Sequence, residues 1–122
     1  MSDFENVVER YMDAWNEADA AQRAKKVAAL WAEDGGYTDP LAHVSGHDSV
    51  AAMIAGAREQ FPGFTFRPVG GVDAHHDVAR FSWGMYADGA DEPTVIGFDV
   101  AVLAADGRIA HVYGFLDKVP TA

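Results

Sequence analysis

The hydrophobic pattern of this chain changes from a helical period to a strand period after Gly63. Before this point apolar residues recur every three or four positions, which predicts helices over 3–17, 20–32 and 47–61. After it apolar residues alternate, which predicts strands at about 64–70, 77–87, 94–104 and 108–117. Asp88-Gly89 and Asp106-Gly107 are hairpin signals between these strands. Helices packed on a curved, mostly antiparallel sheet, an α+β arrangement, are therefore expected.

The connection between the second and third predicted helices carries its own signals. Asp19 followed by Gln22 resembles a capping box that starts the second helix. The run 33–36 contains two glycines and is expected to end that helix. Tyr37, Thr38 and Asp39 then form a short extended piece, because Pro40 favours an extended conformation for Asp39. A loop is expected over 41–46.

Size and charge limit the classes of protein that this chain can belong to. Its 122 residues fit one domain, 1–122. Nineteen acidic residues against nine basic ones give a formal charge of −10, which disfavours nucleic acid or an anionic membrane as a partner. Neutral or cationic small molecules suit such a surface better. The absence of cysteine excludes disulfides and a thiolate nucleophile.

No targeting signal is visible in the sequence. The first residues lack a basic segment followed by an apolar one, and no apolar stretch is long enough to span a bilayer. We therefore expect a soluble, cytoplasmic protein.

Asp99 lies in the middle of the run 94–104, whose other residues are apolar or small except for Thr94. If both faces of this strand are covered, burial raises the pKa of the carboxyl group by roughly 3 to 5 units. A neutral acid that donates a hydrogen bond is then the cheaper state. Alternation also allows Asp99 to lie on a solvated face, but its face-mates would be apolar. A functional interior acid and a structural or exposed one both remain open from this run alone.

Three local patterns follow one another along the chain: 10–19 (RYMDAWNEAD), 30–40 (LWAEDGGYTDP) and 96–109 (IGFDVAVLAADGRI). In this order and spacing they make the chain similar to the nuclear transport factor 2-like superfamily, which includes ketosteroid isomerases and SnoaL-like polyketide cyclases. The resemblance covers nearly the whole chain and implies a cone with an apolar pocket, formed by three N-terminal helices on a curved sheet. This fold hosts enzymes, binding modules and assembly domains alike.

In ketosteroid isomerases the family pattern places a tyrosine on the first helix, an aspartate in an Asp-Pro step and an aspartate inside a later apolar strand. Tyr11, Asp39 and Asp99 match these positions. The resemblance implies that ionised Asp39 takes a proton next to a carbonyl group. Tyr11 and neutral Asp99 then donate hydrogen bonds to the carbonyl oxygen. Each residue also has a simpler interpretation: Tyr11 as a core residue, Asp39 as a turn former before proline.

The sequence departs from the isomerase pattern around residue 43. The segment 41–46 is shorter than the loop expected in a ketosteroid isomerase, so the pocket mouth differs. His43 is an additional candidate acid or base, as in dehydratase and cyclase branches of the superfamily, or simply a solvated loop residue. The adjacent His75 and His76 do not predict a metal site, because neighbouring residues on a strand point to opposite faces. We expect no metal and no cofactor.

The cone model also predicts the pocket walls and a partner. Aromatic stripes at these spacings more often belong to a plain core, and in a cone fold the same residues serve as core and as pocket wall. Apolar residues on both faces of the last strands, notably Phe98, Tyr113 and Phe115, predict a homodimer through the sheet, with His111 packed on that outer face. The predicted pocket residues are Trp31, His43, Met53, Phe81, Trp83, Met85, Val112 and Leu116.

The sequence thus favours a cofactor-independent enzyme that moves protons on a small hydrophobic carbonyl compound, as a double-bond isomerase or polyketide-type cyclase. One alternative is a ligand-binding or assembly module that kept the cone without the chemistry. Another is an epoxide hydrolase of the limonene type, which uses an Asp-Arg-Asp arrangement. Arg80 is the only arginine in the centre of a predicted strand, and alternation turns it away from Phe81 and Trp83.

Overall fold

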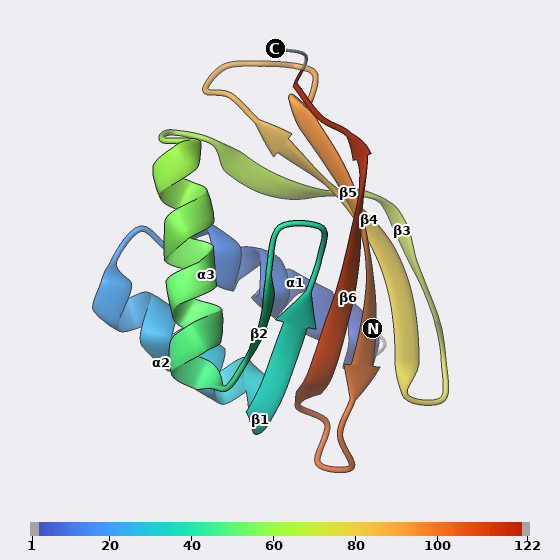
Figure 1. The fold of residues 1–122 in the computed structure, drawn as a ribbon. Helices are drawn as coiled ribbons and strands as arrows, with labels where there is room; N and C mark the ends of the chain where they lie inside the picture. Colours follow the sequence, from blue (N-terminus) through green and yellow to red (C-terminus); the bar gives the residue numbers. More distant parts are fainter. Residues whose placement is uncertain (1–2, 121–122) are drawn as a thin grey trace.

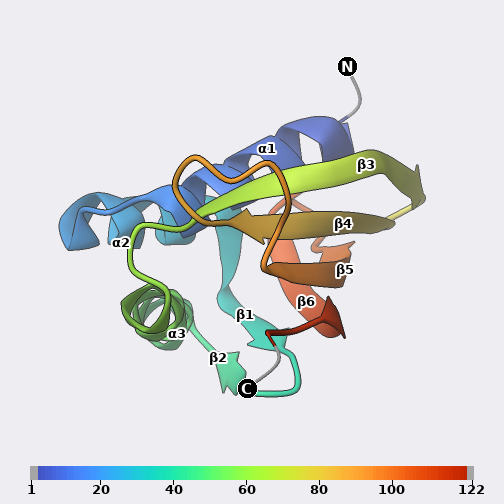
Figure 2. The same ribbon diagram turned by 90° about the horizontal axis from the view of Figure 1, so that it is seen from above.

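Three helices lie on one side of a curved six-stranded sheet in the computed structural model, which describes residues 3–120 (Figures 1 and 2). The helices are α1 (Asp3–Asn16), α2 (Ala20–Leu30) and α3 (His47–Gln60). The strands are β1 (Trp31–Thr38), β2 (His43–Ser45), β3 (Thr65–His75), β4 (Val78–Tyr86), β5 (Val95–Leu103) and β6 (Ile109–Lys118). The predicted α+β class, three helices on a mostly antiparallel sheet, is confirmed.

The sheet order is β2-β1-β6-β5-β4-β3, so the first long strand lies beside the last. The pair β1–β6 is parallel and the other four pairs are antiparallel. This order brings the end of β1 next to the middle of β6, and β5 next to both β4 and β6. Residues far apart in the sequence, including Asp39 and Asp99, are thereby brought to one region.

The strand β1 begins at Trp31, directly after α2, and the predicted helix over 20–32 is therefore two residues too long. Gly35 and Gly36 lie inside the strand instead of ending the helix. Both are buried, and a Cβ on Gly35 would lie 2.7 Å from the Ile109 carbonyl oxygen of β6. The pairing with β6 shifts register between Trp31 and Gly36. These glycines allow a close approach of two backbones.

The strand β3 also runs further than predicted, to His75 rather than to residue 70. Its pairing with β4 shifts register between Val69 and Asp73, and Gly70 has a φ of 76°. The pair Gly70–Gly71 therefore forms an irregularity within the strand and not its end. Residues 43–45 of the predicted loop form the short edge strand β2.

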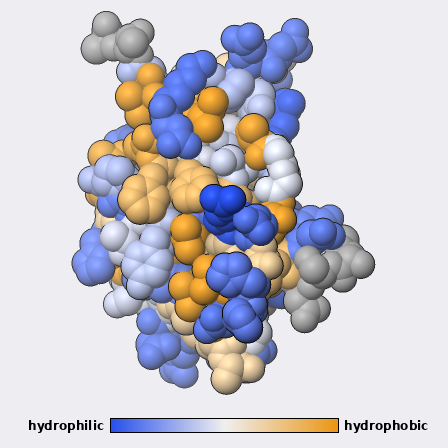
Figure 3. All heavy atoms as spheres, turned by 90° about the vertical axis from the view of Figure 1, so that its right-hand side faces the viewer, coloured by the Kyte–Doolittle hydropathy of each residue, from blue (hydrophilic) through white to orange (hydrophobic). Residues whose placement is uncertain are grey.

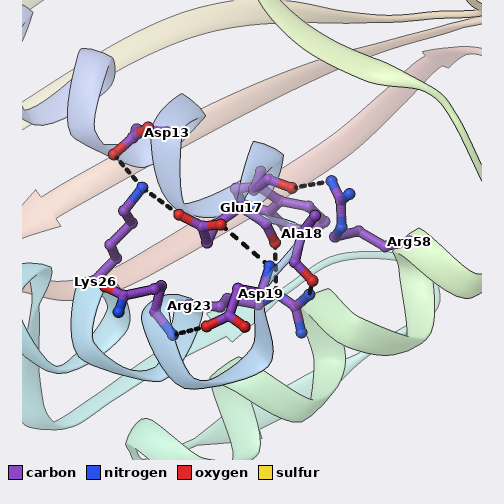
Figure 4. Close-up of polar contacts among 9 residues, drawn as sticks. Asp13, Glu17, Ala18, Asp19, Arg23, Lys26 and Arg58 are labelled. Atoms are coloured by element: carbon purple, nitrogen blue, oxygen red, sulfur yellow. Dashed lines mark hydrogen bonds and ion pairs between the residues drawn. The ribbon is translucent and has the colours of Figure 1, made fainter.

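Polar contacts fix the corner between α1 and α2 (Figure 4). Asp19 caps α2, because its Oδ2 accepts a hydrogen bond from the Gln22 backbone N–H at 2.9 Å. Arg23 is buried and donates to the carbonyl oxygens of Glu17 and Ala18 at 3.0 and 3.2 Å. Lys26 pairs with Asp13 of α1 and with Glu17, which follows α1. These contacts orient α1, the helix that carries Tyr11.

The core fills the space between the helices and the inner face of the sheet. Its members come from α1, α2, α3 and from the alternating inner positions of the strands. None of the helices within residues 3–120 is long and apolar enough to cross a membrane. The largest side chains that are fully buried are Trp31, Tyr11, Tyr37, Leu30, Ile54, Ile109, Val27, Val50, Val112 and Asp99.

The outer face of the sheet has no helix over it, and apolar residues gather there among polar ones (Figures 1 and 3). Phe98 of β5 pairs in register with Phe115 of β6, and their ring centroids are 6.4 Å apart. Tyr113 and Phe115 are 45% and 56% exposed. His111 packs against Tyr113, with ring centroids 4.4 Å apart.

Candidate active site

Asp99 lies on the buried face of β5 and is 1% exposed. Val95, Gly97 and Ala101 share this face with it and are buried as well. The hydroxyl group of Tyr11, from α1, donates a hydrogen bond to Asp99 Oδ2 at 2.7 Å. The other carboxyl oxygen, Oδ1, has no hydrogen-bond partner within the described structure. The structure thus brings together the tyrosine and the interior acid that the sequence singled out.

Burial raises the pKa of Asp99 from 3.8 to about 7. The Tyr11 hydrogen bond and the nearby Trp83 side chain lower the pKa against this rise, and the charge of Asp39 adds to the rise. A carboxyl group with this pKa is neutral in a large fraction of molecules at neutral pH. It can therefore donate a hydrogen bond that an ordinary aspartate cannot.

Asp39 follows β1 and is held by three donors. Its Oδ1 accepts hydrogen bonds from the backbone N–H groups of Leu41 and Ala42, both at 2.8 Å. Its Oδ2 accepts from the hydroxyl group of Tyr37 at 2.8 Å. These three hydrogen bonds fix the orientation of the carboxyl group. Asp39 is therefore a positioned carboxylate beside the turn at Pro40.

Tyr37 is a functional candidate that the sequence interpretation missed. Burial, followed by the charges of Asp99 and Asp39, raises its pKa well above the usual value, so the phenol keeps its proton. The site thus holds two tyrosine–carboxyl pairs, Tyr11 with Asp99 and Tyr37 with Asp39. Residues 37 and 39 share a strand face, so period-2 alternation was the signal available.

Gly114 of β6 lies where the two pairs meet. A Cβ at this position would lie 2.7 Å from Asp99 Oδ1, 3.3 Å from Asp39 Cβ and 3.4 Å from the Tyr37 hydroxyl oxygen. Asp99 and Gly114 are also partners in the β5–β6 register. The absence of a side chain at 114 thus leaves room for the buried carboxyl group.

Replacing Gly114 by alanine is expected to destabilise the fold and disturb the site. The added methyl group overlaps Asp99 Oδ1, and overpacking of this kind costs about 1 to 3 kcal/mol of unfolding free energy. Urea denaturation checks the loss, with Gly56→Ala as control, because a Cβ on Gly56 meets nothing within 4 Å. Equal unfolding free energies for Gly114→Ala and wild type would contradict this account of Gly114.

A pocket of about 300 Å³ opens beside Asp39 and Tyr37. Asp39 is the one charged residue in its lining, and the rest of the wall is mainly aromatic and aliphatic. A second hollow, of about 340 Å³ between α1 and β3, contains none of Tyr11, Asp39 and Asp99. The residues that line the first pocket are Trp15, Tyr37, Asp39, Leu41, Ala57, Gln60, Phe61, Phe66, Trp83, Met85, Val95, Leu116, Val119 and Pro120.

Of the predicted pocket residues, Trp83, Met85 and Leu116 line the pocket. The other five do not. Trp31, Phe81 and Val112 are buried in the core, and the partly buried Met53 packs against it. Phe81 lies too deep in the core to line the pocket. It pairs in register with the buried Asp99, and its ring centroid lies 5.4 Å from that of Tyr11.

His43 is exposed and turns toward the outer side of the sheet. The Thr38 hydroxyl oxygen lies 2.8 Å from His43 Nδ1 and 2.8 Å from His111 Nε2. Burial, and secondarily the charge of His43, lower the pKa of His111. These contacts tie β1 to β2 and β6, and they place His43 away from the pocket lining.

Arg80 lies on the outer face of β4 and forms an ion pair with Asp73 at 3.1 Å. It does not take part in an Asp-Arg-Asp arrangement with Asp39 and Asp99. Residues 75–76 belong to the end of β3 and the turn after it, where His76 has a φ of 52°. Within residues 3–120, no group of three or more histidines and carboxylates is arranged to hold a metal ion.

Comparisons with known proteins agree with the fold. Residues 8–112 match the SnoaL-like domain family. A solved structure of a candidate isomerase of the SnoaL-like family from Agrobacterium tumefaciens str. C58 is 40% identical, with a TM-score of 0.91 over 96% of this chain and 99% of that one. No match was found among curated proteins.

More distant structures share the fold at low identity. A candidate polyketide cyclase from Sinorhizobium meliloti is 18% identical, with a TM-score of 0.70 over 93% of this chain and 99% of that one. A SnoaL-like protein of unknown function from Burkholderia thailandensis e264 is 16% identical, with a TM-score of 0.71 over 92% of both chains. With the family match covering most of its length, the chain belongs to the SnoaL-like domain family.

Proposed function

We propose that this protein is a proton-transfer enzyme that acts without a cofactor on a small, neutral, hydrophobic carbonyl compound. The observation that carries the proposal is a pair of carboxyl groups in unlike surroundings, one in the lining of an apolar pocket and the other buried near it. Asp39 accepts three hydrogen bonds, whereas Asp99 is buried with a pKa of about 7. A hydrogen-bonded carboxylate and a buried acid of raised pKa suit the roles of base and acid.

The chemistry follows from these roles. The Asp39 carboxylate removes a proton from the carbon next to the carbonyl group, and the electron pair of that C–H bond moves toward the oxygen. Tyr11 and neutral Asp99 donate hydrogen bonds to this oxygen as it becomes negative. Asp39 then returns the proton to another carbon, which moves the double bond. Alternatively, the enolate carbon attacks a second carbonyl group, whose π electrons move to its oxygen; that oxygen takes the proton from Asp39, and a ring is closed.

The pocket lining supports a neutral substrate. Since Asp39 is its one charged residue, nothing in the lining pairs with a carboxylate or phosphate group. Apolar walls of this kind bind hydrophobic ligands by removing their surface from water. The 40% identical structure named as a candidate isomerase supports the same reaction class.

A panel of β,γ-unsaturated ketones of graded size tests the proposal, together with phenols that mimic the enolate. We expect at least one ketone to be isomerised, and phenols to bind wild type more tightly than a Tyr11→Phe, Asp99→Ala double variant. Arg80→Gln, on the outer face, serves as a control. If no ketone reacts and phenols bind both proteins equally, a non-catalytic binding or assembly module replaces the enzyme.

We also propose that two copies of the chain pair through the outer face of the sheet. Each chain carries a formal charge of −10, so two copies repel each other unless they meet at an uncharged surface. The strip of Phe98, Val100, Tyr113 and Phe115 offers such a surface, because it is apolar and contains no charged residue.

Sedimentation at micromolar concentration is therefore expected to show a dimer. Phe115→Asp places a charge at the centre of the strip and is expected to yield monomers. Leu41→Asp, an equally apolar-to-acidic change on the 80% exposed Leu41 at the pocket, away from the strip, should leave the dimer intact. A monomeric wild-type protein would refute the pairing.

A further inference from the structure

An aromatic wall separates the pocket from Tyr11. Trp15, Phe66 and Trp83 line the pocket of about 300 Å³, and the same three side chains line a small cavity of about 10 Å³ that Tyr11 and Met12 close from the other side. Asp99 is not among the pocket-lining residues. A ligand in the pocket thus meets Asp39 directly, but the wall lies between the ligand and Tyr11.

The indole of Trp83 rests on Gly97. These residues are partners in the β4–β5 register, and a Cβ on Gly97 would lie 2.1 Å from Trp83 Cζ2 and 2.2 Å from Cε2. The indole therefore occupies the space that any other side chain at 97 would fill. Because Gly97 has no side chain, it leaves a flat surface on the inner face of the sheet, on which a ring can lie. We call this surface over Gly97 the seat.

Trp83 is the least buried member of the wall. Trp15 is buried and its ring packs against those of Tyr11, Tyr37 and Phe66, at 5.0 to 6.2 Å between centroids. Phe66 is also buried. Trp83 is only partly buried, and its ring packs against one aromatic ring, that of Phe66, at 5.6 Å.

Two buried polar atoms near the wall lack partners in this closed arrangement. They are Asp99 Oδ1 and Trp15 Nε1. Buried groups of this kind cost free energy until a partner satisfies them. A ligand oxygen that reaches the Tyr11–Asp99 pair would provide such a partner when Asp99 is protonated.

We propose that Trp83 is a gate and a specificity-determining residue: its indole leaves Gly97 to let a flat, neutral ring lie on that seat with its oxygen at Tyr11 and Asp99. The proposal rests on the proposed function, and it narrows the substrate class to compounds with a planar ring or conjugated system beside the carbonyl group. A bulky, three-dimensional ring system does not fit a seat formed for an indole.

Fluorine NMR with 5-fluorotryptophan tests the gate, because the chain has three tryptophans, Trp15, Trp31 and Trp83. Their signals are assigned with single Trp→Phe variants. On titration with 2-naphthol, a flat neutral phenol, we expect the Trp83 signal to shift far more than that of the buried Trp31. The shift should vanish in the Tyr11→Phe, Asp99→Ala double variant.

Association kinetics give a second measurement. If the open form is a minority of about 10% or less, removing the gate with Trp83→Ala should speed 2-naphthol association by about 10-fold or more. Trp83→Phe, which keeps most of the packing, should give a smaller gain. Phe61→Ala is the matched control, because Phe61 lines the pocket but not the small cavity.

The outcomes separate the two proposals. Naphthol binding that depends on Tyr11 and Asp99, without a shift of the Trp83 signal and without faster association in either Trp83 variant, overturns the gate and leaves the proposed function standing. Binding that is the same in wild type and the double variant overturns the proposed function, and the gate with it.

Discussion

Replacing Asp39 by asparagine is expected to slow isomerisation of a reactive β,γ-unsaturated ketone by about 100-fold to 10,000-fold, the usual contribution of a positioned general base. The amide is nearly the same size as the carboxylate, and its oxygen can still accept from the Leu41 and Ala42 backbone N–H groups. The loss should therefore fall on the rate constant kcat rather than on substrate binding. Steady-state kinetics measures both quantities.

Two comparisons make this result specific to Asp39. A phenol that binds through Tyr11 and Asp99 should bind Asp39→Asn at least as well as wild type, because the variant loses a negative charge near the bound oxygen. Asp48→Asn makes the same chemical change on the exposed start of α3 and should keep full activity. If Asp39→Asn retains more than about a tenth of the wild-type rate, another group is the base.

The burial of Asp99 is expected to make the fold less stable as the pH rises from about 4 to 7. The folded chain holds the Asp99 proton up to a pKa of about 7, whereas the unfolded chain releases it near 3.8. Between these values the folded state binds more protons, so the free energy of unfolding falls with pH. About three pKa units at 1.36 kcal/mol each amount to about 4 kcal/mol, fully lost above pH 7.

Urea denaturation of wild type and Asp99→Asn at pH 4.5 and pH 8 measures this contribution. Other ionisable groups are shared by the two proteins, so their effects cancel in the difference between them. Asparagine does not titrate, and its side-chain oxygen can accept the Tyr11 hydrogen bond. Relative to wild type, the variant should gain several kcal/mol between the two pH values. A constant difference would mean that Asp99 titrates normally in the folded protein.

The fold was predictable because its signals are local. The stripes of α1 and α3 and the alternation in β4, β5 and β6 each place their element within about one or two residues of its bounds. The errors in the predicted helix and strand bounds lie at glycines. Gly35 and Gly36, and likewise Gly70 and Gly71, carry the composition of turns, but in the structure they serve close approach to β6 and a strand irregularity. Whether such a glycine forms a turn or lies inside a paired strand depends on the partner strand, which the local sequence does not specify.

The candidate site was predictable in part for a similar reason. The residues that share a face with Asp99 are apolar or small, which favours its burial, although the run alone left an exposed position open. Alternation does not tell which residues of a buried face line the pocket. Phe81 and Trp83 share a face, but of these two only Trp83 lines the pocket. His43 lies on the outer side because the β1–β2 hairpin pairs it with Thr38. The role of Gly114 depends on register between β5 and β6, which sequence periodicity does not specify.

The parallel pairing of β1 with β6 has a consequence for how the chain folds. Tyr11 and Asp99 are 88 residues apart in sequence. The strand β1 can pair with β6 only after the last strand has been made. Contacts between such distant segments form slowly, because loop closure must be achieved before they contribute any stability. During synthesis, a ribosome-bound chain that has not yet produced β6 holds Asp39 and Asp99 on unconnected pieces. Binding competence should therefore appear abruptly and late, at the step that docks β6 between β1 and β5.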